Sequence, residues 1–106
     1  MTDKVIALLG FAAKSGALAF GVKGCVSAIK KSQAKGIFFA TDISAKSRKE
    51  ILFHCDKFGV RAFELKFMSS EKLTKSVGRK CSAVVVTNNS FNEPIVSYLT
   101  SGREEI

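Results

Sequence analysis

The sequence predicts an α/β protein in which helices cover both faces of a four-stranded mixed sheet, as a three-layer α/β/α sandwich. Three observations support this prediction. Hydrophobic spacing alternates between a helical and a strand period along the chain. The run AVVV at 83–86 is apolar at every position, which is typical of a central strand covered on both faces. With 106 residues, 46% of them hydrophobic, and one proline, the chain fits a single packed domain over residues 1–106.

The first half of the chain is expected to run helix, strand, helix, strand. A helix from about Asp3 to Lys14 precedes a short strand at 17–20, which Gly21 closes. From Val22 the spacing becomes helical again, and GIFFATD at 36–42 has the composition of a buried strand. The second helix should turn its apolar positions inward and its polar positions outward. The inward set is Val22, Cys25, Val26 and Ile29, and the outward set is Lys23, Ser27, Lys30 and Lys31.

A third helix and an outer strand should follow. Ser44 is placed to cap a helix over 45–57, and Gly59 is placed to end it. VRAFELKF at 60–67 alternates apolar and polar residues, as a strand with one solvated face does. The inner face of the helix is expected to be Ile51, Leu52, Cys55 and Phe58.

Two further helices flank the predicted central strand at 83–86. Ser70 is expected to cap a short helix ending at Val77. Ser90 and Glu93 have capping-box spacing, and Pro94 is compatible with a first helical turn. The last helix should therefore end near residue 99, and we expect a flexible tail at 100–106.

Charge is distributed very unevenly. The net charge is +8, and no acidic residue occurs between Asp3 and Asp42. That interval holds Lys4, Lys14, Lys23, Lys30, Lys31 and Lys35, and Arg79 and Lys80 form a second basic pair. Such an imbalance favours a polyanionic partner, with nucleic acid ahead of a membrane surface. A lysine-rich surface that only keeps the protein soluble is the competing interpretation.

Few residues offer chemistry. The only histidine, His54, adjoins Cys55 on a predicted helix, where neighbouring side chains diverge, so the two cannot form a catalytic pair. Carboxylates are scattered and suggest neither an acid–base pair nor a metal site. Three cysteines without a CxxC pair are expected to be small buried residues in a reducing cytoplasm. We therefore expect no enzyme activity, no cofactor, no metal and no membrane segment.

Glycines mark the two candidate binding segments. Gly21 and Gly24 flank Lys23 at the expected start of the second helix, where free backbone N–H groups and the helix dipole attract phosphate. The segment SVGRKCS at 76–82 places a glycine before two cations at the start of the central strand. If these segments share one end of the sheet, they form a single basic cleft. The competing interpretation is that Gly21 only ends a strand, that Gly24 only allows close helix packing, and that 76–82 is an ordinary solvated loop.

Taken together, LLGFAAKSGALAFGVKGCVSAIKK, IFFATDIS and VGRKCSAVVVTNNSF resemble the ribosomal protein L7Ae/L30e/Gadd family, particularly its short bacterial YlxQ/YbxF-like members. The resemblance spans nearly the whole chain. It implies the α/β/α sandwich already predicted, and binding to the kink-turn, a sharply bent RNA with tandem sheared G·A pairs. Gly21 matches the family's helix-opening glycine, and Lys23 matches the first of two recognition positions.

The chain departs from the family pattern at two positions. The second recognition position, usually Glu or Gln, is Gly24, and the lysine that usually follows one turn later is Ser27. Loss of a bidentate contact to a base costs about 1 to 3 kcal/mol of discrimination, so we expect relaxed selectivity. Asp42 matches the polar loop after the second strand, and residues 78–82 match the variable loop that packs against bent RNA.

Two hypotheses follow. The first is a non-enzymatic protein that binds structured RNA, ribosomal or other non-coding, and that can have protein partners in a ribonucleoprotein. The second is a protein-interaction adaptor of the same fold that has lost specific kink-turn recognition. The candidate RNA-binding residues are Gly21, Lys23, Gly24, Ser27, Lys30, Lys31, Asp42, Gly78, Arg79, Lys80, Cys81 and Ser82.

Overall fold

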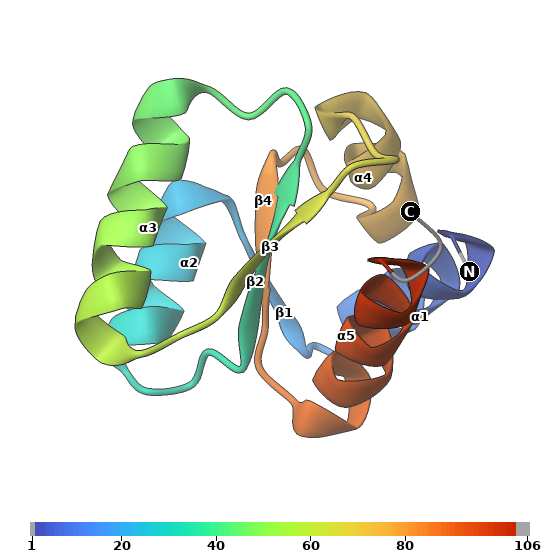
Figure 1. The fold of residues 1–106 in the computed structure, drawn as a ribbon, viewed down its shortest axis with the longest axis horizontal. Helices are drawn as coiled ribbons and strands as arrows, with labels where there is room; N and C mark the ends of the chain where they lie inside the picture. Colours follow the sequence, from blue (N-terminus) through green and yellow to red (C-terminus); the bar gives the residue numbers. More distant parts are fainter. Residues whose placement is uncertain (1, 104–106) are drawn as a thin grey trace.

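The computed structural model describes residues 2–103 and contains a four-stranded sheet with helices on both faces (Figure 1). The elements are α1 (Thr2–Lys14), β1 (Leu18–Phe20), α2 (Gly21–Lys30), β2 (Gly36–Ala40), α3 (Ala45–Phe58), β3 (Ala62–Leu65), α4 (Ser70–Val77), β4 (Ala83–Val86) and α5 (Asn89–Arg103). The strand order is β1-β4-β2-β3. Strands β2 and β3 are parallel and the other two pairs are antiparallel, which confirms the mixed sheet.

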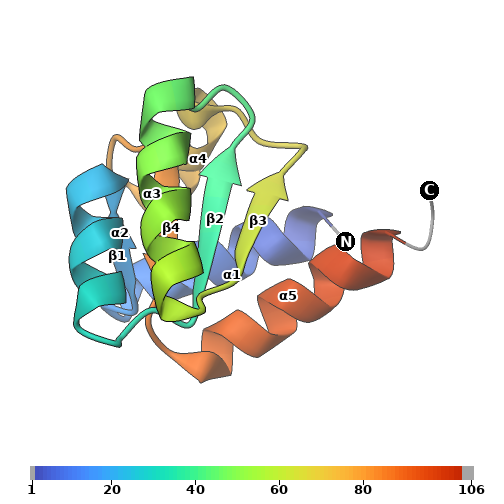
Figure 2. The same ribbon diagram turned by 60° about the vertical axis from the view of Figure 1, so that its left-hand side comes forward.

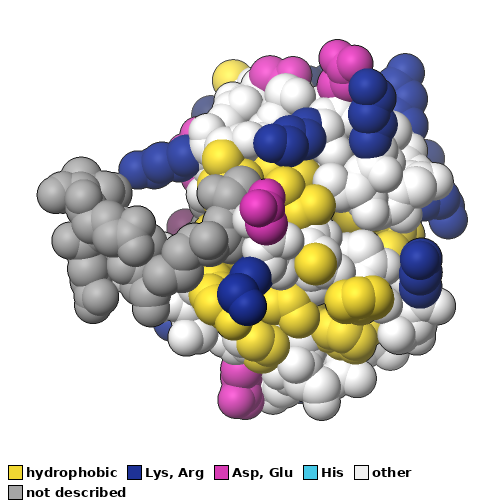
Figure 3. Space-filling view, turned by 90° about the vertical axis from the view of Figure 1, so that its right-hand side faces the viewer, with side chains coloured by type: hydrophobic (Ala, Val, Ile, Leu, Met, Phe, Trp, Pro, Cys, Tyr) yellow, Lys and Arg dark blue, Asp and Glu magenta, His cyan; other side chains and the backbone are white. Residues whose placement is uncertain are grey.

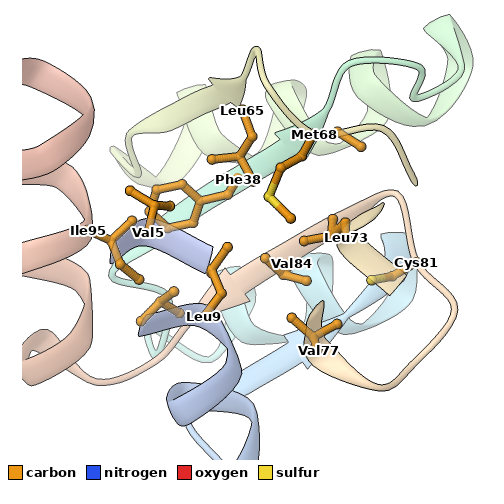
Figure 4. Close-up of a cluster of buried hydrophobic side chains, with 12 residues drawn as sticks. Val5, Leu9, Phe38, Leu65, Met68, Leu73, Val77, Cys81, Val84 and Ile95 are labelled. Carbon is orange, nitrogen blue, oxygen red and sulfur yellow. The ribbon is translucent and has the colours of Figure 1, made fainter. Parts of the chain in front are cut away.

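Three layers are visible when the sheet is seen edge-on (Figure 1). Helices α2 and α3 cover one face, and α1, α4 and α5 cover the other. Each face has its own buried cluster, because successive strand residues point to opposite sides. Phe38 and Val84 face α1, α4 and α5 (Figure 4), whereas Ile37 and Val85 face α2 and α3. The predicted sandwich is thus confirmed.

The predicted strand positions are also confirmed. Strand β4 lies between β1 and β2, and all four of its residues are buried. Strand β3 lies at an edge, with Glu64 exposed and Leu65 buried. Both β2 and β3 are shorter than the predicted stretches at 36–42 and 60–67, because residues at the ends of these stretches belong to the connecting loops.

Helix α3 begins and ends where the sequence predicts, but one side chain expected on its inner face is exposed. The Ser44 hydroxyl accepts a hydrogen bond from the Ser47 N–H, and Gly59 ends the helix at φ 71°. Ile51 and Cys55 are buried, and Leu52 is half-buried. The prediction for Phe58 was wrong, since this last helical residue is 43% exposed.

The two C-terminal helices start at caps other than those predicted. Ser69, not Ser70, caps α4, and its hydroxyl accepts from the Lys72 N–H. Helix α5 begins at Asn89, and the Asn88 side-chain oxygen accepts from the Ser90 N–H. Consequently Pro94 lies in the second turn, where its ring nitrogen cannot donate a backbone hydrogen bond.

The predicted tail is partly helical. Helix α5 continues to Arg103, so the expected end near residue 99 was wrong, and residues 104–106 of the predicted tail lie outside the described residues. Together with α1 and α4, this helix forms the side of the molecule shown in Figure 3, where hydrophobic side chains lie between scattered cations. Helix α2, which carries Lys23 and Lys30 of the predicted basic residues, packs with α3 on the opposite face of the sheet (Figure 1).

All three cysteines are buried and free, as expected. Burial raises the pKa of the Cys25 thiol to about 12, and it raises the pKa of Cys55 and Cys81 as well. A buried thiol that stays protonated is a poor nucleophile and a poor metal ligand. These residues therefore serve packing.

Candidate nucleic-acid interface

Three segments far apart in the sequence meet at one end of the sheet. In the strand register, Phe20 at the end of β1 pairs with Val84, and Phe39 near the end of β2 pairs with Ala83. Because β4 runs opposite to both strands, its start lies where they finish. The first turn of α2, the loop that contains Asp42 and the turn at 78–82 therefore share this end (Figure 2).

The first turn of α2 is open. Gly21 has φ +74°, a conformation that favours glycine, and no heavy atom lies within 4 Å of where a Cβ would be. Phe20 occupies the N-cap position and provides no side-chain hydrogen bond, and the turn contains no acidic residue. Lys23 is exposed beside it. Backbone N–H groups and the positive end of the helix dipole thus face the same side as a lysine.

Arg79 connects the second basic segment to this helix. Its guanidinium lies over the Phe20 ring, 5.0 Å from the ring centroid. A cation held over an aromatic face keeps its N–H donors free at the edge of the guanidinium plane. We call Gly21, Lys23, Gly24, Arg79 and Lys80 the mouth surface. The prediction from the sequence required both basic segments to share one end of the sheet, and in the structure they lie side by side there.

The turn that carries Arg79 and Lys80 is held at both ends. Gly78 ends α4 at φ 81° and donates its N–H to the Thr74 carbonyl over 2.8 Å. The Cys81 N–H donates to the Thr74 hydroxyl over 3.2 Å. At the far end, the carbonyl of Ser82 accepts from Ala40. Two exposed cations are therefore displayed on a braced backbone.

Asp42 has a structural role. Its carboxylate accepts hydrogen bonds from the Ser70 hydroxyl at 2.6 Å and from the Ser70 N–H at 2.7 Å, at the start of α4. These bonds hold the pKa of the Asp42 carboxyl below its ordinary value. The Ser82 hydroxyl lies 2.7 Å from that of Ser70 and extends the network to the basic turn. Asp42 thus fixes the loops around the mouth surface.

The remaining predicted site residues are not all at the mouth surface. The Cys81 side chain is buried among apolar residues, so only its backbone lies in the turn. Lys30 and Lys31 lie at the other end of α2, with Lys30 roughly 10 Å along the helix axis from Lys23. They share a shallow groove of about 350 Å³ with the start of the helix. Its lining is Lys23, Val26, Ser27, Lys30, Lys31 and, from α3, Glu50.

Sequence reasoning did not find the parts played by Phe20, Ser70 and Glu50. Phe20 precedes Arg79 by 59 positions, and their contact depends on the pairing of β1 with β4. Ser70 was predicted to cap α4, but it hydrogen-bonds the Asp42 carboxylate instead, and Ser69 is the cap. One feature of the sequence could have indicated the contact of Phe20 with a cation: an aromatic residue stands directly before Gly21, and its ring face can bind a cation.

Other chemistry is sparse within residues 2–103. This part of the chain contains no group of three His, Cys, Asp or Glu side chains arranged to hold a metal ion. No helix in it is long and apolar enough to cross a membrane. His54 is half-buried, and its Nδ1 has no hydrogen-bond partner in the described part of the protein.

Fold and surface together define a small α/β/α sandwich protein with a basic surface at one end of its sheet. The sequence profile of the ribosomal protein L7Ae/L30e/S12e/Gadd45 family matches residues 3–96, and the chain belongs to this family. The match confirms the resemblance seen in the sequence.

Individual relatives agree with this assignment. The chain is 27% identical over 89 residues to the RNA-binding protein YlxQ of Enterococcus faecium, covering 84% of each chain. A protein of unknown function from Bacillus halodurans C superposes with a TM-score of 0.81 at 20% identity, covering 89% of this chain and 94% of that one. The Giardia lamblia 15.5kD RNA binding protein gives a TM-score of 0.72 at 11% identity, covering 95% and 86%. These two structures share the fold.

Proposed function

We propose that this protein binds structured RNA through the mouth surface and catalyses no reaction. The observation that carries the proposal is the position of the Arg79 guanidinium over the Phe20 ring, which joins two basic segments at an uncapped helix start. Free backbone N–H groups, Lys23 and Arg79 all suit phosphate oxygens. Family membership and the similarity to the RNA-binding protein YlxQ support RNA as the polyanion.

Selectivity for kink-turns should be relaxed in this chain. Gly24 has no side chain to reach a base, and Ser27 is exposed one turn later without a positive charge. Phosphate contacts position an RNA but carry little sequence information. The protein should therefore select its RNA more by shape than by individual bases. The proposed ligand is a folded ribosomal or other non-coding RNA, bound in the cytoplasm as part of a ribonucleoprotein.

Fluorescence anisotropy with two labelled hairpins of equal length, one with a kink-turn and one fully paired, tests the proposal. Both should bind, with affinity falling linearly with salt on logarithmic axes as counterions are released. The kink-turn preference should stay below the roughly tenfold that one good base contact provides. Equal affinities that do not change with salt would contradict the proposal, and so would a failure to bind either hairpin.

Gly24→Glu should restore part of the preference for the kink-turn. A Cβ at this position would lie 3.4 Å from the Ala19 Cβ, an ordinary contact, so the helix accommodates a side chain there. A carboxylate at the second recognition position can accept hydrogen bonds from a base edge, and it also repels phosphate. We expect the ratio of kink-turn to paired-hairpin affinity to rise about tenfold. Gly24→Ala is the matched control and should leave this ratio unchanged.

A further inference from the structure

The outward face of α3 carries an exposed aromatic residue that the mouth surface does not use. Phe53 is 63% exposed, the largest exposure among the described large hydrophobic side chains. Its ring meets the His54 ring edge-on, with centroids 5.2 Å apart and planes at 82°. Most of this large apolar side chain therefore lies in water, which costs free energy unless a partner covers it.

Charges around Phe53 favour an anionic partner. Lys49 and Lys57 lie one turn before and one turn after it on the same side of the helix, and Lys46 lies nearly two turns before. The acidic residues nearby are Glu50 and Asp56. Across the groove, Lys30 at the end of α2 and Lys31 just after it add two more, so cations outnumber carboxylates five to two over these positions.

This face is continuous with the mouth surface. Helices α2 and α3 lie side by side and both begin at the same end of the sheet (Figure 2). Phe53 is eight residues along α3, roughly 12 Å from that end. A strand of stacked nucleotides advances about 3.4 Å per residue, so three or four nucleotides span the distance.

We propose that the α3 face is a second RNA site, in which Phe53 stacks with an unpaired base and Lys49 and Lys57 contact the adjoining phosphates. The ligand is a single-stranded extension of the folded RNA assigned to the mouth surface, so the proposal rests on the proposed function. An aromatic ring between cations is the arrangement that proteins use for single strands, because only an unpaired base presents its face for stacking. Double-stranded RNA can meet the lysines but not the ring.

The experiment compares three labelled probes by anisotropy. The first is a blunt hairpin, the second carries a single-stranded extension of six adenosines at either end of the hairpin, and the third carries six abasic residues in place of the adenosines. For the wild-type protein the adenosine extension should tighten binding about tenfold, as one stacked base does, and the abasic extension should give less. Phe53→Ala should lose this gain and keep its affinity for the blunt hairpin. Phe53→Tyr should retain the gain and Phe53→Leu should lose it, since leucine is apolar but cannot stack.

Phe11→Ala is the matched control. Phe11 is 58% exposed on α1, in the opposite helical layer, so this change removes an equally accessible ring elsewhere. The proposal is overturned if the adenosine extension adds nothing, if Phe53→Leu keeps the gain, or if Phe11→Ala loses as much as Phe53→Ala. Phe53-dependent binding to phosphatidylserine vesicles with no effect of the extension would also overturn it and assign the face to lipid.

The two proposals fail separately. If the blunt hairpin does not bind but free hexa-adenosine binds in a Phe53-dependent way, the mouth surface is wrong and the α3 site stands. If the blunt hairpin binds and the extension changes nothing, the mouth surface stands and the α3 site is wrong. Circular dichroism of each variant verifies its folding, which an exposed substitution should leave intact.

Discussion

Replacing Lys23 and Arg79 together by alanine should weaken binding of a folded RNA roughly one hundred-fold at about 0.1 M salt. Each side chain presents a cation to the same end of the sheet, and losing a hydrogen bond to a charged group such as phosphate costs about 1.5 to 3 kcal/mol. Removing two phosphate contacts should also lower the slope of log affinity against log salt by about two. Anisotropy titrations at several salt concentrations measure both quantities.

Two control variants separate local contacts from overall charge. Lys14→Ala removes one cation from the end of α1, which lies at the opposite end of the sheet from the mouth surface. It should lower the affinity for RNA less than Lys23→Ala or Arg79→Ala does. Arg79→Lys keeps the charge but loses the planar group that lies over Phe20, so it should fall between wild type and Arg79→Ala. An equal loss in Lys14→Ala would mean that only net charge attracts the RNA, and the mouth surface would have no special role.

Most of the fold follows from local sequence patterns. Helical spacing and caps such as Ser44 and Gly59 depend on residues within a few positions of each other, so they can be read directly. The uninterrupted apolar run at 83–86 predicted the central strand because both faces of β4 are covered. Predictions were wrong where the tertiary surroundings decide, as for Phe58, which is exposed at the last position of α3 because helical spacing alone does not say what packs against a helix end.

The sequence indicated which residues belong to the candidate site but not how they are brought together. Glycines and lysines near Gly21 and Gly78 marked two basic segments, and nothing local brings them together. Their contact results from antiparallel pairing of β1 and β4, which places Phe20 opposite the start of β4 and so beneath Arg79. Burial of Cys81 was predicted, but its place among the candidate binding residues did not follow from that burial, and in the structure its side chain packs in the core.

The largest expected loss of stability is that of Phe38→Ala. Phe38 is fully buried on β2, between the sheet and the layer of α1, α4 and α5 (Figure 4), and its ring stacks on Phe63 with centroids 5.5 Å apart. Truncating a buried phenylalanine removes its transfer free energy and leaves a cavity, at a cost of about 3 to 5 kcal/mol. Natural domains have only about 5 to 15 kcal/mol of total stability, so this variant should be close to unfolding.

Urea denaturation followed by circular dichroism measures this effect, and Phe11→Ala provides the matched comparison. Both changes remove the same side chain, but Phe11 is 58% exposed, so its variant should stay within about 0.5 kcal/mol of wild type. Phe38→Leu should lose less than Phe38→Ala, because the smaller cavity keeps more contacts. If Phe38→Ala and Phe11→Ala unfolded at the same urea concentration, Phe38 would not be a core residue, and the sheet that holds Gly21 and Arg79 together would need a different packing.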